Sequence, residues 1–304
     1  MTPVTADPII SVRDLHRDYR RPRTSLRRPG LVVRALRGVS LDVAPGEKFG
    51  IVGESGSGKS TLLRLIAALE APTSGQVEVL GRSVVGRSER DLGFLRTSLQ
   101  LVFQDPMSSL DPRMRVRDIV AEPLLAQSHS RGERENRVGE VLTAVGLGHE
   151  AAHRYPHQFS GGQRQRISLA RALAPGPRIL VADEPVSALD VSLRAQVLNL
   201  ITDLVESFDL TLVFVSHDLA VVRHVCDRVA VMHEGKIVEQ GLTADVYDAP
   251  QHPYTQRLVR AVPTLRRALA GATAHDLTAS GHRDFPTTGD DPSRAPSRRT
   301  SQRP

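Results

Sequence analysis

The sequence predicts an α/β protein built around a mainly parallel sheet. Three apolar runs of strand length, residues 99–103, 179–182 and 210–215, alternate with stretches of helical periodicity. Short buried strands that alternate with helices are typical of parallel sheets, because the connecting helices cover both faces. A fourth apolar run, residues 49–52, leads directly into a glycine-rich loop and another helical stretch, 60–70. The glycine loop is therefore expected between a buried strand and the start of a helix.

The other elements follow in chain order. Further strands are expected at residues 9–12 and 31–43, with a basic, proline-containing loop between them at 20–30 and a turn at 44–47. Further helices are expected at residues 116–126, 134–145, 163–174 and 193–208. After Pro263 the apolar content falls, so residues 264–304 are predicted to be a disordered tail. No internal repeat is visible, which favours a single copy of this α/β unit.

Length and composition exclude several classes of protein. The chain has 304 residues, 40% of them hydrophobic, which suffices for one or two domains with a real core. Its single cysteine excludes an internal disulfide, a multi-thiolate zinc site and an iron–sulfur cluster. No apolar run approaches the roughly 18 residues of a membrane span, and the first residues lack a signal-peptide pattern. These features predict a cytoplasmic protein.

The net charge of +6 does not indicate a nucleic-acid partner. Residues 1–37 carry +6 and residues 264–304 carry +3, whereas residues 38–263 carry −3. The body is therefore mildly acidic, and only 4% of the residues are aromatic and able to stack on bases. We expect no nucleic-acid binding.

Residues 53–61 have the glycine, four residues, glycine–lysine–serine spacing of a phosphate-binding loop. The candidate nucleotide-binding residues are Gly53, Glu54, Ser55, Gly56, Ser57, Gly58, Lys59, Ser60 and Thr61. Backbone N–H groups can surround a phosphate only where no Cβ blocks them, and the following helix adds its positive dipole end. Lys59 would contact the β- and γ-phosphates, and Ser60 would ligate Mg²⁺. The alternative is a glycine-rich turn with an incidental lysine, but only three of the 40 basic residues are lysines.

A carboxylate pair follows the strand predicted at 179–182. Asp183 is expected to hold Mg²⁺, and Glu184 is expected to polarise an attacking water. An Asp-Glu pair after apolar residues can also be only a strand end that meets solvent. Its occurrence together with the phosphate loop favours the catalytic interpretation.

A second anion-binding helix end narrows the prediction to a family. Its residues are Ser160, Gly161, Gly162 and Gln163, with the serine as a natural N-cap. The alternative is an ordinary capped helix. With this segment the sequence resembles the ATP-binding cassette (ABC) family, whose signature is Ser-Gly-Gly-Gln, and residues 9–263 match its motifs in order. The resemblance implies a head-to-tail dimer with ATP between the Lys59 loop of one subunit and the Ser160 helix of the other.

The resemblance also implies roles for individual residues elsewhere in the chain. Gln104 matches the glutamine that senses Mg²⁺ and links the site to the membrane partner, although a surface residue at a strand end would look the same. His217 matches the histidine that contacts the γ-phosphate; a lone histidine can also fill a surface or core position. Residues 187–190 match the loop that meets the opposite subunit. Tyr19 would stack on adenine, but it could equally be a tyrosine on an edge strand.

The resemblance also implies an architecture and partners. It predicts a P-loop NTPase core, an N-terminal antiparallel β subdomain and an α-helical subdomain that carries the signature. The ATP-binding domain would span residues 1–263, with the helical subdomain at about 105–172 and a C-terminal extension at about 243–263. The implied partners are transmembrane permease subunits, a second ABC ATPase as homo- or heterodimer, and indirectly a substrate-binding protein. The implied location is peripheral, on the cytoplasmic face of the cell membrane.

The predicted substrate class depends on a short sequence motif that is typical of one subfamily. Residues 249–255, Ala-Pro-Gln-His-Pro-Tyr-Thr, resemble the C-terminal extension of importers for oligopeptides, dipeptides and nickel, although they could be only a proline-punctuated helix start. The four-cysteine cluster of some members is absent, since Cys226 is alone. An ATP-hydrolysing subunit that energises peptide import is therefore expected. The alternatives are an importer for nickel or another small solute, a soluble non-transport ABC ATPase and an exporter ATPase.

The segment after Gln104 is expected to couple ATP hydrolysis to the membrane. Residues 105–112 are too proline-punctuated for a helix or strand, so an exposed loop is predicted. In this family the helical stretch that follows receives the coupling helices of the membrane subunits. Met107, Leu110 and Met114 are the candidate groove residues, because adaptable methionines suit a surface that repacks.

Overall fold

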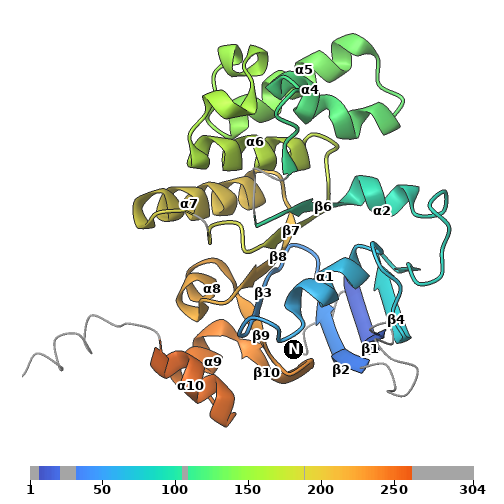
Figure 1. Ribbon diagram of the computed structural model, residues 1–304, viewed down its shortest axis with the longest axis vertical. Coiled ribbons are helices and arrows are strands. Elements are labelled where there is room, and N and C mark those ends of the chain that lie inside the picture. Colours follow the sequence, from blue (N-terminus) through green and yellow to red (C-terminus); the bar gives the residue numbers. More distant parts are fainter. Residues whose placement is uncertain (1–6, 21–31, 105–108, 188, 262–304) are drawn as a thin grey trace, which may run out of the picture. The chain divides into compact units, whose positions relative to one another are not determined.

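The computed structural model describes residues 7–20, 32–104, 109–187 and 189–261 (Figure 1). The chain separates after Val262 into two units, and the second, Pro263–Pro304, lies outside the described residues. The predicted basic loop at 20–30 lies outside them apart from Arg20, and so do Met107, Ala188 and the predicted tail.

The central sheet has six strands in the order β10-β9-β3-β8-β7-β6. The strands are β3 (Lys48–Val52), β6 (Leu99–Val102), β7 (Ile179–Asp183), β8 (Thr211–Ser216), β9 (Arg228–His233) and β10 (Lys236–Leu242). All neighbouring pairs are parallel except β9 and β10, which pair antiparallel. The prediction of a mainly parallel sheet is confirmed.

Side-chain alternation on the central strands divides the core into two clusters. On β8, Leu212 and Phe214 belong to one cluster, whereas Val213 and Val215 belong to the other. Successive side chains of a strand point to opposite faces, so a strand without polar alternation must be covered on both sides. All six residues of β8 are buried accordingly.

A second, antiparallel sheet has the order β2-β1-β4-β5. Its strands are β1 (Ile10–Arg20), β2 (Val32–Val43), β4 (Ser74–Val79) and β5 (Arg82–Ser83). The expectation that the first strand ends at residue 12 is wrong, because β1 continues to Arg20. Its polar second half is held by distant partners: the Asp18 N–H donates to Thr73 Oγ1 at 2.9 Å, and Arg17 pairs with Glu70 at 3.2 Å.

Helices connect and cover the strands. Those in the N-terminal half are α1 (Lys59–Ile66), α2 (Gly93–Ser98), α4 (Val116–Ala121), η1 (Glu122–Ala126) and α5 (Arg131–Ala144). The later ones are η2 (His149–His153), η3 (Pro156–Gln158), α6 (Gly161–Leu173), α7 (Val191–Ser207), α8 (Leu219–Val225), α9 (Thr243–Asp248) and α10 (Pro253–Ala261). Helices α4, α5 and α6 contact one another and form the helical part seen in green in Figure 1.

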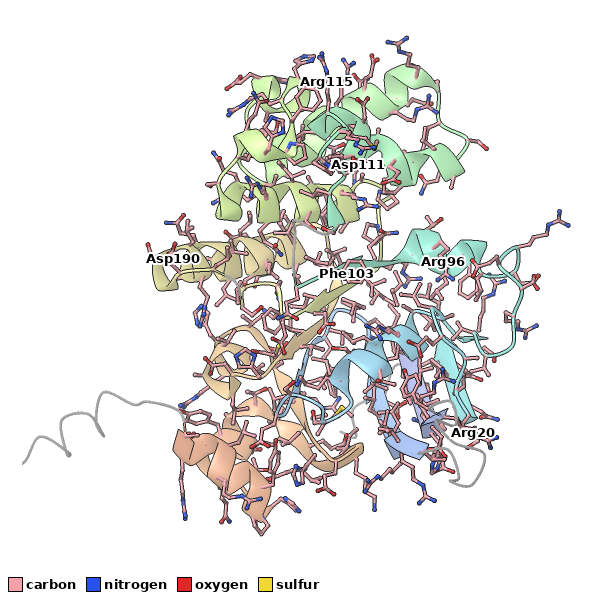
Figure 2. The ribbon with its side chains drawn as sticks, viewed as in Figure 1. Arg20, Arg96, Phe103, Asp111, Arg115 and Asp190 are labelled. Carbon is pink, nitrogen blue, oxygen red and sulfur yellow. The ribbon has the colours of Figure 1, made fainter. Side chains whose placement is uncertain are left out.

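Several predicted boundaries differ from the structure for local reasons. The helix predicted at 60–70 ends at Ile66, because Ala68 takes the left-handed conformation with φ of +49°. β6 stops at Val102, and the next residue, Phe103, has 45% of its surface exposed (Figure 2). Leu110 was expected on an exposed loop, but it is only 3% exposed and belongs to the core cluster that joins the helical part to one face of the central sheet. The prediction that Leu110 lines a docking groove is therefore wrong.

Candidate functional site

The predicted phosphate loop lies between β3 and α1, where the sequence places it. Its open side is formed by Glu54, Ser55 and Gly56, which are exposed, and Ser60 is exposed at the start of α1. Lys59, by contrast, is only 4% exposed. Its Nζ donates hydrogen bonds to the carbonyl oxygens of Gly53 at 2.7 Å and Glu54 at 3.0 Å. The ammonium therefore sits inside the loop and closes it.

Two glycines of the loop are required by close approaches of the backbone. A Cβ at Gly53 would lie 2.2 Å from the Met232 carbonyl oxygen, well below any real contact distance. At Gly58, φ is +107° and a Cβ would lie 2.7 Å from the Ala35 carbonyl oxygen. L-residues rarely adopt such a φ, so glycine is the residue that fits. The loop is thus pressed against β2 and the end of β9.

The back of the loop is also held by hydrogen bonds from the C-terminal part of the chain. The Gly235 N–H donates to the Ser57 carbonyl oxygen at 3.0 Å. The Glu54 N–H donates to the Tyr254 hydroxyl at 2.9 Å. Sequence reasoning assigned no role in the site to Gly235 or Tyr254, since both lie about two hundred residues further along the chain and carry no local signal for the contact.

The carboxylate pair lies beside this loop. β7 ends at Asp183, whose carboxylate is hydrogen-bonded to the Ser60 side chain. Burial raises the pKa of Asp183, and the Ser60 hydrogen bond partly opposes the shift. Burial lowers the pKa of Lys59, whereas the charges of Glu184 and Asp183 act to raise it. These three charged groups therefore share one partly desolvated environment.

The hydroxyl of Ser60 and the carboxylate of Asp183 fit a magnesium ion. Both are hard oxygen donors, they are adjacent, and they lie at the mouth of a loop that suits phosphate. Mg²⁺ is usually held by one or two protein oxygens together with substrate phosphates and water. Gln104, which supplies an amide oxygen, is exposed two residues beyond the end of β6. The donor set is therefore consistent with the predicted metal site.

Glu184 is held in an unusual backbone conformation. Its φ is +47°, which costs a non-glycine residue about 1–3 kcal/mol and is typical of functional positions. Its N–H donates to the Val215 carbonyl oxygen at 3.0 Å, and its carbonyl accepts from the Ser187 hydroxyl at 3.0 Å. Its side-chain Oε2 lies 3.0 Å from Nδ1 of His217. The structure thus brings the predicted base and the predicted histidine together.

The predicted signature segment begins helix α6. Ser160 Oγ accepts from the Gln163 N–H at 3.3 Å, and the Ser160 N–H donates to Gln163 Oε1 at 3.0 Å, which completes a capping box. Ser160, Gly161 and Gln163 are exposed, whereas Gly162 is buried against Leu193 of α7. The helix end therefore presents its polar groups to solvent.

Two predicted groups are not joined to the phosphate loop. Within the described ranges, no hydrogen bond or ion pair links Ser160 or Gln163 to residues 53–61. Tyr19 lies on β1, opposite Val33, and its hydroxyl donates to Glu70 at 2.6 Å. Glu70 follows the C-terminal end of α1, at the far end of that helix from the loop. A role for Tyr19 in adenine binding stays a prediction.

Comparisons with known proteins agree with this geometry. Residues 36–187 match the family model described as ABC transporter, and residues 238–283 match the one described as oligopeptide/dipeptide transporter, C-terminal region. The solved dimeric, post-hydrolysis structure of the ATP-binding cassette MJ0796, bound to ADP and Pi, has a TM-score of 0.68 and 31% identity. It covers 77% of this chain and 98% of that one.

Two curated relatives are named for peptide transport. The chain is 52% identical over 259 residues to the oligopeptide transport ATP-binding protein OppD of Mycobacterium tuberculosis, covering 85% of this chain but 42% of that protein. It is 49% identical over 260 residues to the di/tripeptide transport ATP-binding protein DppF of Pseudomonas aeruginosa, covering 85% of this chain and 80% of that protein. The chain thus spans less than half the length of the mycobacterial relative. In the part of the chain that the structure describes, no helix is long and apolar enough to cross a bilayer.

Proposed function

Because the chain belongs to the ABC transporter ATPase family, we propose that it binds and hydrolyses ATP to energise peptide import through separate permease subunits. The observation that carries the proposal is the cluster in which Ser60 and Asp183 are hydrogen-bonded beside the Lys59 loop, with Glu184 next to them. This cluster combines a phosphate cradle, a metal site and a base. Each is needed for phosphoryl transfer to water.

Each side chain has a defined task in this proposal. The phosphates of ATP lie against the backbone N–H groups of the loop, and Lys59 exchanges its carbonyl partners for phosphate oxygens. Mg²⁺, held by Ser60 and Asp183, would neutralise phosphate charge. Glu184 accepts a hydrogen bond from the attacking water and orients it, while the contact with His217 fixes the direction of the carboxylate. Gln104, beyond β6, would report the state of the metal site to the membrane partner.

A second subunit would complete the site. The exposed start of α6 offers the Ser160 hydroxyl, the Gln163 side-chain amide and the N-terminal end of the helix dipole to an anion. These groups are not joined to the loop of their own subunit, which supports their engagement of ATP across a dimer. The proposed partner is another copy of this chain or a related ATPase.

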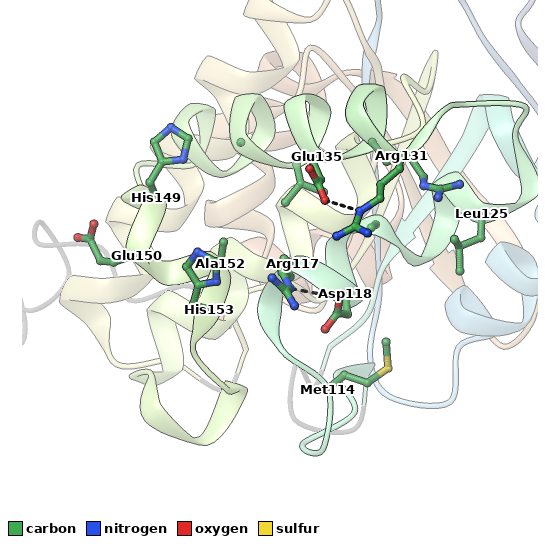
Figure 3. A pocket seen from close by; sticks show the side chains of 14 residues that line it. Met114, Arg117, Asp118, Leu125, Arg131, Glu135, His149, Glu150, Ala152 and His153 are labelled. Carbon is green, nitrogen blue, oxygen red and sulfur yellow. Dashed lines mark hydrogen bonds and ion pairs between the residues drawn. The ribbon is translucent and has the colours of Figure 1, made fainter.

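A groove in the helical part is the proposed docking site for the permease. Its volume is about 730 Å³, and Met114, Leu125 and Val138 are among the apolar residues that line it (Figure 3). Leu125 is 65% exposed and lies in this groove together with other apolar side chains, an arrangement that fits a surface covered in a complex. Arg131 and Glu135 also line the groove, where they form an ion pair with Arg131 Nε 2.9 Å from Glu135 Oε1. Of the three residues predicted for docking, Met114 lies here.

The docking proposal is tested with Leu125→Glu. The charge should reduce co-purification of the permease subunits by at least tenfold and leave ATP affinity of the isolated chain unchanged. Leu242→Glu is the matched control, because Leu242 is also exposed, at 56%, but lies at the end of β10. Equal loss of assembly in both variants, or none in either, would contradict docking at this groove.

Peptide specificity is tested on the assembled transporter. Peptides are favoured over nickel by the names of the relatives and by the match of residues 238–283. ATP hydrolysis would be measured in vesicles that contain the permease subunits and the substrate-binding protein, with an oligopeptide, with Ni²⁺ or with neither. Stimulation by the oligopeptide alone is expected. Stimulation by Ni²⁺ alone would support the nickel alternative, and no stimulation by either would contradict both.

A further inference from the structure

Helix α10, which comes after β10 and α9, reaches back to the phosphate loop. Tyr254, on α10, is 2% exposed, and its hydroxyl accepts a hydrogen bond from the Glu54 N–H at 2.9 Å. The two residues are 200 positions apart in the chain. The Tyr254 ring stacks on His233 at the end of β9, with centroids 3.9 Å apart and planes inclined by 23°. One tyrosine therefore connects the C-terminal helix, the central sheet and the loop.

The start of α10 is fixed by a carboxylate of the sheet. Glu239, on β10, accepts from the Gln251 N–H at 2.8 Å through one oxygen and from the His252 N–H at 3.0 Å through the other. His252 Nδ1 in turn accepts from the Tyr254 N–H at 3.2 Å. These bonds leave the tyrosine little freedom to move along the sheet. The Tyr254 hydroxyl is thus held in a fixed position, in which it accepts the hydrogen bond from the Glu54 N–H.

The contact with Tyr254 orients one particular group of the loop. The first carbonyls of the loop, those of Gly53 and Glu54, are occupied by Lys59, while the Glu54 N–H points to the tyrosine. Without that acceptor, a donor in a partly buried position would lack a partner and would favour a rotated peptide. Rotation of the peptide between Gly53 and Glu54 would move the carbonyl that holds Lys59. The Lys59 ammonium would then no longer be held in its position relative to the backbone N–H groups that surround the phosphates.

We propose that Tyr254 is a positioning residue for nucleotide binding, which acts through the Glu54 N–H to hold the phosphate loop in its ATP-binding form. The C-terminal extension would then be a working part of the ATP site as well as part of the fold. This inference rests on the proposed role of the Lys59 loop in binding ATP.

The test compares two tyrosine-to-phenylalanine variants of the full chain. Tyr254→Phe keeps the stacked ring and removes only the acceptor. Tyr247→Phe is the matched control, since Tyr247 lies on α9, in the same region, with Arg223 over its ring. For Tyr254→Phe, the Kd and KM for MgATP should rise roughly three- to tenfold, the effect of one ordinary hydrogen bond, with kcat within about twofold of wild type. For Tyr247→Phe neither quantity should move by more than about twofold.

Hydrogen exchange supplies a second readout, because coupling between two sites is reciprocal. If Tyr254 favours the ATP-binding form of the loop, MgATP must slow exchange of the α10 amides, and Tyr254→Phe must remove that protection. If Tyr254→Phe does not fold, Glu239→Gln is the second variant. It weakens the hydrogen bonds that Glu239 accepts from the Gln251 and His252 N–H groups, and it should also raise the KM for ATP.

The outcomes separate the inference from the proposed function. A wild-type KM in Tyr254→Phe, or a fall in kcat shared by both tyrosine variants, would overturn the positioning role. Absence of ATP-dependent protection of α10 in wild type would overturn it as well. If Lys59→Ala also left ATP affinity unchanged, the loop itself would not be the ATP site, and the proposed function would fail with the inference.

Discussion

Two serines in the helical part offer a controlled test of the signature segment. Ser160 is the N-cap of α6 and Ser130 is the N-cap of α5, and each forms a capping box with the residue three positions later. In both, the serine Oγ accepts from the backbone N–H of that residue at 3.3 Å. The two side chains therefore make the same structural contribution, but only Ser160 is proposed to bind ATP.

The structural cost of alanine should be equal at the two positions. Loss of a serine N-cap costs about 1 kcal/mol of stability. In a domain of this size that lowers the Tm by about 2–4 °C. Ser160→Ala should in addition lose a hydrogen bond to a phosphate oxygen in the ATP-bound dimer, a bond worth about 1.5–3 kcal/mol. Its ATP hydrolysis should therefore fall roughly 10- to 150-fold, whereas Ser130→Ala should hydrolyse ATP at the wild-type rate.

The assay is phosphate release from MgATP by each purified variant, together with its melting temperature. Matching shifts in Tm with loss of hydrolysis in Ser160→Ala alone would separate binding from capping. If both variants lost the same activity, or if Ser160→Ala retained full hydrolysis, the signature helix would be only a capped helix. The dimeric arrangement would then lose its support.

Three further predictions concern single side chains of the core and the site. Glu184→Gln keeps the contact with His217 but removes the base, so phosphate release should fall by roughly 10²–10⁴ with ATP affinity retained; near-normal turnover would remove Glu184 from its role. Burial raises the pKa of Asp183, so its charge destabilises the fold above that pKa and this cost disappears as the pH falls through it. Asp183→Asn should therefore raise the Tm at pH 7 while abolishing Mg²⁺-dependent hydrolysis, and a lowered Tm would contradict the assignment. Burial also raises the pKa of the Cys226 thiol, so an alkylating reagent should label it only after unfolding; rapid labelling of the native protein would refute its burial.

The phosphate loop and the strands around it could be predicted because their signals are local. The sequence from Gly53 to Thr61 contains the glycines, the lysine and the serine of the loop, and β7 and β8 are short strands made mostly of apolar residues. The Glu184 carboxylate follows β7 directly. Residues that work within one strand-turn-helix segment are visible in the chain itself.

What the sequence did not predict depends on partners far along the chain. The polar half of β1 has no strand-like alternation, and it is extended because Arg17 and Asp18 find partners at Glu70 and Thr73. Leu110 lies in a proline-rich stretch that resembles a surface loop, but it is buried in the core cluster that joins the helical part to the central sheet. The strands β4, β5, β9 and β10 were also not predicted.

The central claim, that ATP hydrolysis by this chain drives peptide import, is tested most directly by uptake of a labelled oligopeptide. Uptake would be measured in cells of the source organism that lack the chain, after its return as wild type, as Glu184→Gln or as Ser130→Ala. Wild type and Ser130→Ala should restore uptake, whereas Glu184→Gln should leave it at the level of the deletion. Full uptake in cells without the chain, or full restoration by Glu184→Gln, would contradict the claim.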